Sequence, residues 1–315
     1  MNTLIGHSGF VGGNLLRQGK FESCFNSTNI DMVGDVDSGI AVCAAAPGSM
    51  FEANRYPDKD QANIASLQRS LAKVKAKQFV LISSIAVLED FAAGHDESTS
   101  KFQAELAYGR HRRELEVFAK GHFDRCLIVR LPALFGPGLR KNFLYDLLNP
   151  APTMLSHEGY IEMLNALPAF RDIAKEIYAW QQERGLHLID RCVLDRHPEK
   201  LKFEDALVEA GLSAAKFTHP RSTFQFYNMA NLWSDISMAI ENRLDVLHLC
   251  PEPIRAGDVH ILTTGREMPD AGARLHHEDM RTLNAGLFQQ SSHYTAPRDI
   301  VIKDVADFLA REAGQ

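Results

Sequence analysis

The chain has 315 residues, of which 45% are hydrophobic, and its formal net charge is −6. This length suits one large α/β domain or two modest ones. The acidic balance argues against a nucleic-acid partner, because proteins that bind nucleic acid usually present a basic face.

The N-terminal residues and the cysteines indicate a cytoplasmic protein. The start, MNTLIGHSGF, lacks the basic region and the cleavage site of a signal peptide. No apolar run reaches the ~18 residues needed to span a bilayer, so we expect no membrane partner. The five cysteines are dispersed without a CxxC pair, which indicates reduced thiols. The histidines lack an HxxxH spacing, so we expect no metal site.

The chain opens as a strand, a turn and a helix. Residues 3–5 form a short apolar run, a glycine-rich segment follows at 6–12, and the next residues can begin a helix. A second strand is expected near 24–27. Four later runs are continuously apolar, which is typical of strands buried in a parallel sheet. These runs lie at 40–45, 79–83, 126–131 and 246–249.

Helical patterns separate these strands. In residues 61–75, Ile64, Leu67, Leu71 and Val74 recur at spacings of three and four, which predicts one buried face. Further helices are predicted over 103–119 and 303–312. Strands that alternate with helices predict an α/β fold with a doubly wound parallel sheet, as in Rossmann folds.

The pattern changes after about residue 140. Residues 143–216 are predicted to be mostly helical, without a convincing strand. We therefore expect a dinucleotide-binding Rossmann domain over 1–140, with a late return near 222–250. A smaller, mostly helical substrate-binding portion is expected over 141–315.

The glycine-rich turn has the spacing GxxGxxG, from Gly6 through Gly9 to Gly12. Glycine suits such a turn because the backbone must bend tightly and approach a pyrophosphate without a Cβ in the way. The helix that follows offers N–H groups and a partial positive charge to phosphates. Because the turn lies between a predicted strand and a predicted helix, it favours dinucleotide binding over a plain turn.

The end of the second predicted strand leaves NAD and NADP open. An acidic residue usually contacts the ribose of NAD at that point, but the residues at 25–29 are neutral and Asp31 is the first acid. No lysine or arginine there favours the extra phosphate of NADP. Asn26 and Ser27, together with Ser8 in the turn, are the candidate cofactor ligands in this region.

Two serines, a tyrosine and an arginine form a candidate catalytic set. Ser83 and Ser84 close a predicted buried strand, and side chains at the carboxyl ends of parallel strands face the ligand crevice. Tyr108 and Arg112 lie four residues apart, so they share one face of a helix. A guanidinium close to a phenol favours the phenolate and is expected to lower its pKa from about 10. Such a tyrosine can exchange a proton with a sugar hydroxyl or a ketone.

With these residues the chain resembles the extended branch of the short-chain dehydrogenase/reductase superfamily, the NAD-dependent epimerase/dehydratase group. Five segments in the family's order and spacing carry the resemblance over the N-terminal part. They are GHSGFVG (6–12), VCAAAP (42–47), LISSIAV (81–87), YGRHR (108–112) and RLPALFGPG (130–138). Two later segments resemble the family's substrate-domain segment and its last strand, FYNMANLW (226–233) and VLHLCPEP (246–253).

The resemblance implies a role for each matching residue. Tyr108 aligns with the catalytic acid/base and Ser84 with the hydroxyl that orients the substrate oxygen, while Ser83 is the adjacent alternative. The cofactor would lie against the glycine turn and the strand ends. Its implied contacts are Gly6, Gly9, Phe10, Val11, Gly12, Ala44, Ala45, Ser83, Tyr108, Arg112, Pro132, Ala133 and Leu134.

Arg112 departs from the family, which has lysine at this position. Arginine keeps the positive charge, but it cannot relay a proton because its pKa stays above ~12. Two interpretations follow. The site is active with an altered third residue, or it is degenerate and Arg110, Arg112 and Arg113 form a solvated face.

The resemblance implies hydride transfer at a carbon of a nucleotide sugar, with NAD or NADP. Family dehydratases carry Asp-Glu directly after the catalytic hydroxyl, whereas this chain has Ile85 and Ala86. Their absence disfavours dehydration and leaves reduction of a 4-keto sugar or epimerisation, in both of which the nicotinamide handles the hydride. A non-catalytic dinucleotide-binding sensor is the alternative function.

Cationic side chains are expected to hold the diphosphate of such a substrate. The candidates are Arg140, Lys141 and Arg221, with Asn142 as a neutral donor. The helix predicted over 103–119 is a candidate homodimer face, although its apolar residues can equally pack on the sheet.

Overall fold

The computed structural model describes residues 1–314, and the chain divides into two compact units. Unit 1 comprises Met1–Leu139, Thr223–Ile254 and His277–Val305, and unit 2 comprises Arg140–Ser222, Arg255–His276 and the chain from Ala306. The segment 277–305, which the sequence analysis placed in the substrate-binding portion, groups with unit 1. No helix within residues 1–314 is long and apolar enough to cross a membrane.

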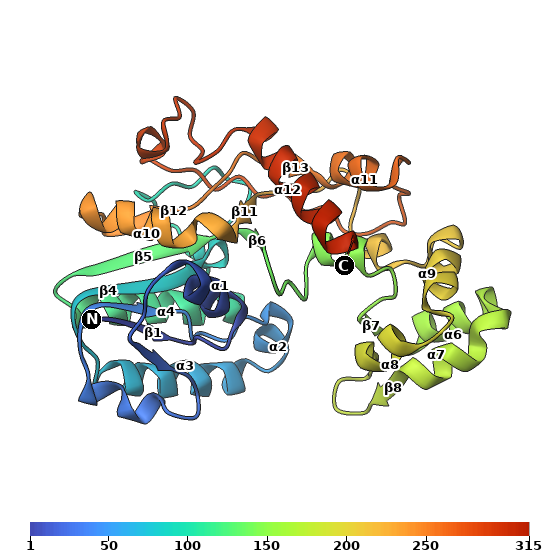
Figure 1. Cartoon of the computed structure of the whole chain (residues 1–315), viewed down its shortest axis with the longest axis horizontal. Coiled ribbons are helices and arrows are strands. Elements are labelled where there is room, and N and C mark those ends of the chain that lie inside the picture. Colours follow the sequence, from blue (N-terminus) through green and yellow to red (C-terminus); the bar gives the residue numbers. More distant parts are fainter. Residues whose placement is uncertain (315) are drawn as a thin grey trace. The chain divides into compact units, whose positions relative to one another are not determined.

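A six-stranded sheet forms the centre of unit 1 (Figure 1). The strands are β1 (Asn2–Ile5), β2 (Ser23–Phe25), β3 (Asp37–Cys43), β4 (Lys75–Ser84), β5 (Cys126–Leu131) and β12 (Val246–His248). All neighbours pair in parallel, in the order β12-β5-β4-β3-β1-β2. The predicted apolar runs form these strands because helices cover both faces of the sheet. The doubly wound α/β fold is therefore confirmed.

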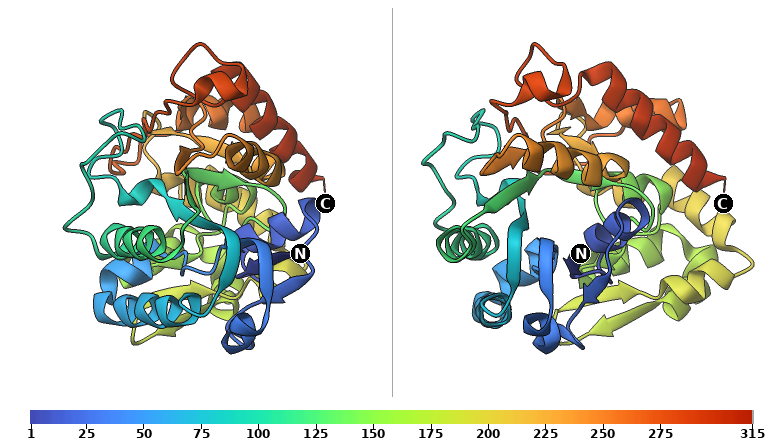
Figure 2. Two further views of the ribbon diagram at one scale, coloured as in Figure 1. Left: turned by 90° about the vertical axis from the view of Figure 1, so that its left-hand side faces the viewer. Right: turned by 60° about the vertical axis from the view of Figure 1, so that its left-hand side comes forward.

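Four helices cover the two faces of this sheet (Figure 1). On one face lie α1 (Phe10–Gln18) and α10 (Leu232–Glu241), and on the other lie α3 (Pro57–Leu71) and α4 (Ala107–His122). Helices α3 and α4 contact each other side by side (Figure 2). The predicted apolar stripe of α3 is buried against the sheet, as expected for an amphipathic helix.

The direction of the strand order reverses between β1 and β3. In open α/β sheets the crevice outside the carboxyl ends of the strands at such a switch point is where ligands bind. Here the glycine turn follows β1, and Ala44 and Ala45 follow β3. The topology thus puts two of the predicted cofactor segments at the same edge of the sheet.

Further elements lie outside the 140–222 segment, most of them in unit 1. Strand β6 (Ala133–Phe135) pairs in parallel with β11 (Phe226–Asn228). The remaining elements outside the 140–222 segment are η1 (Ile30–Asp35), α2 (Met50–Arg55), η2 (Ile85–Val87), β10 (Thr223–Phe224), η5 (Met229–Asn231), β13 (Ile254–Arg255), α11 (Ala256–Thr264), η6 (Ala285–Phe288) and α12 (Arg298–Ala313). Of these, α11 lies in unit 2, and β13 and α12 each have residues in both units.

Unit 2 contains a sheet that the sequence analysis did not predict. Its three strands, β7 (Met154–Leu155), β9 (Leu186–Ile189) and β8 (Tyr178–Gln181), pair antiparallel in that order. The prediction of a helical segment without strands was therefore wrong for these residues. The strands are short, and three of the four residues of β8 are exposed, so they lack the alternation that marks a strand.

The rest of this segment is helical, as predicted. The elements are α5 (Phe143–Leu148), α6 (His157–Ala166), η3 (Pro168–Phe170), α7 (Arg171–Ile177), α8 (Arg191–Arg196), α9 (Lys200–Glu209) and η4 (Ala214–Phe217). Apolar side chains from these helices form a core of their own around Ile173, Phe203 and Leu207.

Candidate active site

The glycine turn lies against the backbone that follows β3. Gly6 has φ +90, and a Cβ there would stand 2.6 Å from the carbonyl carbon and oxygen of Ala44. Gly6 N–H also donates to the carbonyl of Phe25 at 2.7 Å. The turn is thus fixed between the ends of β2 and β3, with no room for a side chain at Gly6.

Helix α1 begins within this glycine-rich segment, at Phe10, and offers its first turn to a ligand. Gly9 is the N-cap residue, and no side chain within residues 1–314 caps the helix. Ser8 and Gly9 are exposed. The first N–H groups of a helix need acceptors, and an anion can supply them. Among the predicted ligands, Phe10 and Val11 occupy this first turn. The glycine turn and the start of α1 therefore fit a pyrophosphate.

The end of β2 is built from neutral side chains that bond one another. Asn26 Oδ1 accepts from the backbone N–H of Thr28 at 2.9 Å and from its hydroxyl at 2.7 Å. Asn29 Oδ1 accepts from the Asn26 N–H at 2.7 Å. The predicted ligands Asn26 and Ser27 lie in this turn, which contains no charged residue. The choice between NAD and NADP stays open.

Tyr108 and Ser84 lie together at the carboxyl end of β4. Ser84 ends the strand, and its Oγ accepts from the Ala86 N–H at 3.2 Å. Its hydroxyl also lies close enough to the Tyr108 side chain, near the start of α4, to lower the pKa of the phenol. The structure thus brings together the tyrosine and one of the two predicted serines.

The contact between α4 and η2 depends on Gly109, a residue that the sequence analysis did not single out. A Cβ at Gly109 would stand 2.0 Å from the carbonyl oxygen of Ala86. Because Ala86 lies two residues after Ser84, glycine next to Tyr108 lets the helix approach the end of β4. The Tyr108 N–H donates to Asn54 Oδ1 at 2.9 Å, which further fixes the start of α4. The glycine directly after Tyr108 in the sequence could have indicated this close approach.

Arg112 lies over the ring of Tyr108 but is held by acceptors on three segments. Its guanidinium carbon lies 4.0 Å from the ring centroid. Nη1 pairs with Asp60 of α3 and contacts the Tyr108 carbonyl at 3.4 Å, and Nη2 donates to the Pro47 carbonyl. The side chain is 3% exposed, so it is not part of a solvated face. Its Nε is buried and has no hydrogen-bond partner among residues 1–314.

The expected lowering of the Tyr108 pKa is wrong. Burial raises the pKa of this phenol above its ordinary value, and this effect outweighs the Arg112 charge and the Ser84 hydroxyl, which lower it. The Asp60 carboxylate also raises it. The guanidinium acts in the predicted direction, but the loss of solvent outweighs it, and the Asp60 carboxylate adds a smaller rise.

Ser83, the adjacent alternative, contacts a different partner. Its hydroxyl donates to Glu116 Oε1 at 2.6 Å. Arg130 donates to the same carboxylate through Nε at 2.9 Å and Nη2 at 2.7 Å. All three residues are buried. Ser83 therefore belongs to a buried polar network, and Ser84 is the serine that contacts Tyr108.

The strand end at 132–134 lies close to α1 through the loop that follows it. Pro132 is buried and Leu134 is partly buried in β6. The Pro137 carbonyl accepts from Asn14 Nδ2 at 3.1 Å and from Arg17 at 3.3 Å, both on α1. Unit 1 thus collects every predicted cofactor segment.

Unit 2 has a cavity of about 880 Å³. Arg140, Lys141 and Asn142 line it, and so does Lys216. Asn142 also caps α5, because its Oδ1 accepts from the N–H groups of Leu144 and Tyr145. Arg221, the other predicted substrate residue, is exposed and does not line this cavity. Apolar side chains, including Met154, Leu155 and Phe217, complete the wall.

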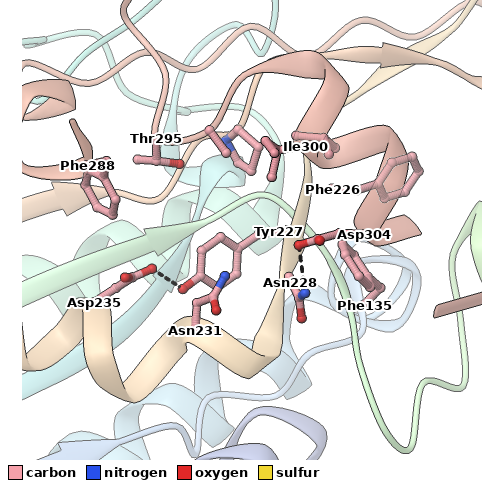
Figure 3. Close-up of a pocket in the computed structure, with 13 residues that line it drawn as sticks. Phe135, Phe226, Tyr227, Asn228, Asn231, Asp235, Phe288, Thr295, Ile300 and Asp304 are labelled. Atoms are coloured by element: carbon pink, nitrogen blue, oxygen red, sulfur yellow. Dashed lines mark hydrogen bonds between the residues drawn. The ribbon is translucent and has the colours of Figure 1, made fainter. Parts of the chain in front are cut away.

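A smaller cavity of about 100 Å³ lies in unit 1 and includes none of the predicted site residues (Figure 3). Tyr227 donates to Asp235 Oδ2 at 2.5 Å, and Asn228 donates to Asp304 at 2.9 Å. Burial raises the pKa of Asp235 to about 6. The sequence analysis likened residues 226–233 to the family's substrate-domain segment but named no site residue among them.

No family model and no curated protein matches the sequence, but solved structures do. A dTDP-4-dehydrorhamnose reductase from Bacillus anthracis in complex with NADP is 13% identical over 98% of this chain and 97% of its own, with a TM-score of 0.61. A UDP-galactose 4-epimerase is 13% identical over 99% of each chain, with a TM-score of 0.59. MoeE5 in complex with UDP-glucose and NAD is 13% identical over 100% of this chain and 99% of its own, with a TM-score of 0.58. The likeness establishes the fold.

Proposed function

We propose that the protein is an NAD(P)-dependent oxidoreductase or epimerase that transfers hydride at a carbon of a nucleotide sugar, with Tyr108 as the acid/base. The observation that carries this proposal is the contact between Tyr108 and Ser84, in the unit that also holds the glycine turn. The substrate class is supported by the similar structures, which include a reductase of a dTDP-linked sugar and a complex with UDP-glucose.

The residues present fit a dinucleotide cofactor. The glycine turn and the start of α1 would hold the pyrophosphate. The buried, unpartnered Nε of Arg112 would find an acceptor in a ribose hydroxyl. When bound, the nicotinamide supplies or accepts the hydride. Similar structures with NADP and with NAD support this cofactor class.

The side chains would handle the proton and orient the substrate. Because burial raises the pKa of Tyr108, the phenol carries its proton near neutral pH. A protonated phenol can donate to the oxygen of a ketone while the ketone is reduced. The Ser84 hydroxyl would orient that same oxygen.

Dehydration remains disfavoured by the residues that follow Ser84. Ile85 is 6% exposed and Ala86 is 3% exposed. Neither carries a carboxyl group that could remove or deliver a proton for the elimination of water.

The cavity of unit 2 is the proposed site of the nucleotide diphosphate. Arg140, Lys141 and Lys216 bring three cations to a cavity that is also lined by three acidic residues, Asp146, Glu158 and Glu162, and by an apolar wall. Cationic side chains suit phosphates, and apolar side chains suit a base and a sugar ring. Lys216 pairs with Glu162 of the same cavity at 3.2 Å, so a phosphate would compete with this carboxylate for the cation.

Turnover of the Tyr108→Phe variant tests the acid/base role. Purified protein is assayed with NADH and with NADPH against nucleotide-linked 4-keto sugars, by loss of the reduced-nicotinamide absorbance. We expect Tyr108→Phe to lose about 10²–10⁴-fold in turnover and to retain cofactor binding, measured by fluorescence.

Two serine variants provide the matched control. Ser84→Ala removes the hydroxyl beside Tyr108, whereas Ser83→Ala removes one bonded to Glu116. We expect the larger loss of turnover from Ser84→Ala. A parent protein that binds the cofactor but turns over none of these sugars would overturn the proposal in favour of the sensor.

A further inference from the structure

Asp60 is a buried carboxylate in contact with the helix that carries Tyr108. It lies in the first turn of α3 and is 4% exposed. Its Oδ2 pairs with Arg112 and also lies 2.8 Å from His111 Nδ1. Buried carboxylates are rare unless they are paired, and both partners of this one are adjacent residues of α4.

The pairing fixes the guanidinium of Arg112. Its two Nη groups are bonded to Asp60 of α3, to the Tyr108 carbonyl of α4 and to the Pro47 carbonyl of the loop after β3. A planar guanidinium held on these three segments cannot turn without breaking several bonds. Its carbon therefore remains 4.0 Å from the centroid of the Tyr108 ring.

We propose that Asp60 is a positioning residue for Tyr108: its carboxylate holds the Arg112 guanidinium on the phenol ring and, through that arrangement, controls proton transfer at the phenol. The effect on catalysis rests on the proposed function, whereas the positioning of Arg112 by Asp60 does not. The charged and titratable groups that face this arrangement are Arg110, His111 and Arg112 from α4 and Asp60 from α3, with the Ser84 hydroxyl from β4.

The charge of Asp60 gives the proposal a measurable sign. Burial is the largest effect on the Tyr108 pKa and raises it. The Arg112 charge and the Ser84 hydroxyl lower this pKa, and the Asp60 charge raises it. Asp60→Asn removes the negative charge and keeps a hydrogen-bonding oxygen for Arg112. The phenol should then ionise at lower pH, and the alkaline limb of a reduction that needs the protonated phenol should move with it.

Titration of Tyr108 itself is the direct test. The protein is labelled with ¹³C at the phenolic carbon of tyrosine, and the Tyr108 signal is identified by its loss in Tyr108→Phe. We expect the titration midpoint to fall in Asp60→Asn and to return toward the parent value in Asp60→Glu. An unchanged midpoint in Asp60→Asn would overturn the proposal.

Glu116→Gln is the matched control. Glu116 lies on α4, the helix that carries Tyr108, and is fully buried. Like Asp60 it pairs with an arginine, but it contacts Ser83 rather than Tyr108. A variant that disturbs only packing should leave the Tyr108 midpoint unchanged. If Glu116→Gln moved it as far as Asp60→Asn, the effect would be general destabilisation and the proposal would fail.

A measurement on the parent protein covers the case in which Asp60→Asn does not fold. In ¹⁵N-arginine-labelled protein, a clamped guanidinium gives two resolved Nη signals, and the Arg112 set is identified by its loss in Arg112→Lys. Averaged Nη signals for Arg112 would refute the clamp. Neither spectrum requires a substrate. An absence of turnover would therefore refute the proposed function, whereas the positioning by Asp60 could still be tested.

Discussion

Replacing Gly109 by alanine introduces a methyl group where α4 leaves no room for one. The new Cβ would stand 2.0 Å from the Ala86 carbonyl oxygen, against an ordinary contact of at least 3.4 Å. The backbone must therefore open by about 1.4 Å. Gln103, whose Cγ and Cβ lie 2.8 and 2.9 Å from the same point, would also have to move. Because Ser84 caps η2, this shift separates the serine from Tyr108.

The expected cost has a structural and a catalytic part. Overpacking of this kind costs about 1–3 kcal/mol of stability, although alanine is ordinarily better than glycine in a helix by up to about 1 kcal/mol. A misplacement of about 1 Å in a catalytic pair can cost about 100-fold in turnover. Urea unfolding measures the first part, and oxidation of NAD(P)H with the best nucleotide sugar measures the second.

Gly121 on the same helix is the control. A Cβ there would meet nothing within 4 Å. Gly121→Ala should hold or raise the free energy of unfolding and leave turnover unchanged. If Gly109→Ala were as stable and as active as Gly121→Ala, the close approach of α4 to η2 would not be what places Tyr108 beside Ser84.

Two further predictions concern buried charges. Burial raises the pKa of Asp146 from 3.8 to about 7, although the Arg191 charge lowers it. Folding therefore favours the neutral carboxyl. The contribution of this group to the free energy of unfolding is complete below pH 3.8 and is lost as the pH rises through about 7. Asp146→Asn should thus gain stability relative to the parent between about pH 4 and pH 7, and a pH-independent difference in urea unfolding would contradict this. Arg130→Met leaves Glu116 buried without its main partner and should lower the free energy of unfolding by about 3–5 kcal/mol. Arg130 helps to hold the Glu116 pKa below its usual value despite burial. The loss of stability should therefore grow as the pH rises above about 4.5. Adding Glu116→Gln should recover part of that loss in the same unfolding assay, and an unchanged loss would show that the charge is not its cause.

Local patterns in the sequence were enough to predict the sheet and the glycine turn. Apart from β2, the strands of the central sheet each contain an apolar run, because helices cover both faces of the sheet, and the strand–turn–helix context of Gly6 is contained in a dozen residues. Ser84 could be matched to the family's serine because it closes a strand. Tyr108 could be matched to the family's tyrosine because Arg112 follows it by four residues, where the family has lysine.

Contacts between distant residues could not be predicted in this way. The pair between Asp60 and Arg112 joins two helices 52 positions apart, and nothing local distinguishes Asp60 from an exposed acid in the first turn of a helix. The net direction of the Tyr108 pKa is decided by burial, which the sequence does not show either. The short strands β8 and β9 likewise acquire their identity by pairing with each other.

The position of β12 in the sheet has a consequence for synthesis of the chain. It pairs with β5, whose six residues are all buried, yet it follows the end of β5 by about 115 residues. A ribosome adding about 5–20 residues per second needs on the order of 10 s to cover that interval. Throughout it, the apolar edge Cys-Leu-Ile-Val-Arg-Leu has no neighbour on its outer side and is open to pairing with another nascent chain. Expression at lower ribosome density, or with a holdase that shields strand edges, should therefore raise the yield of native protein.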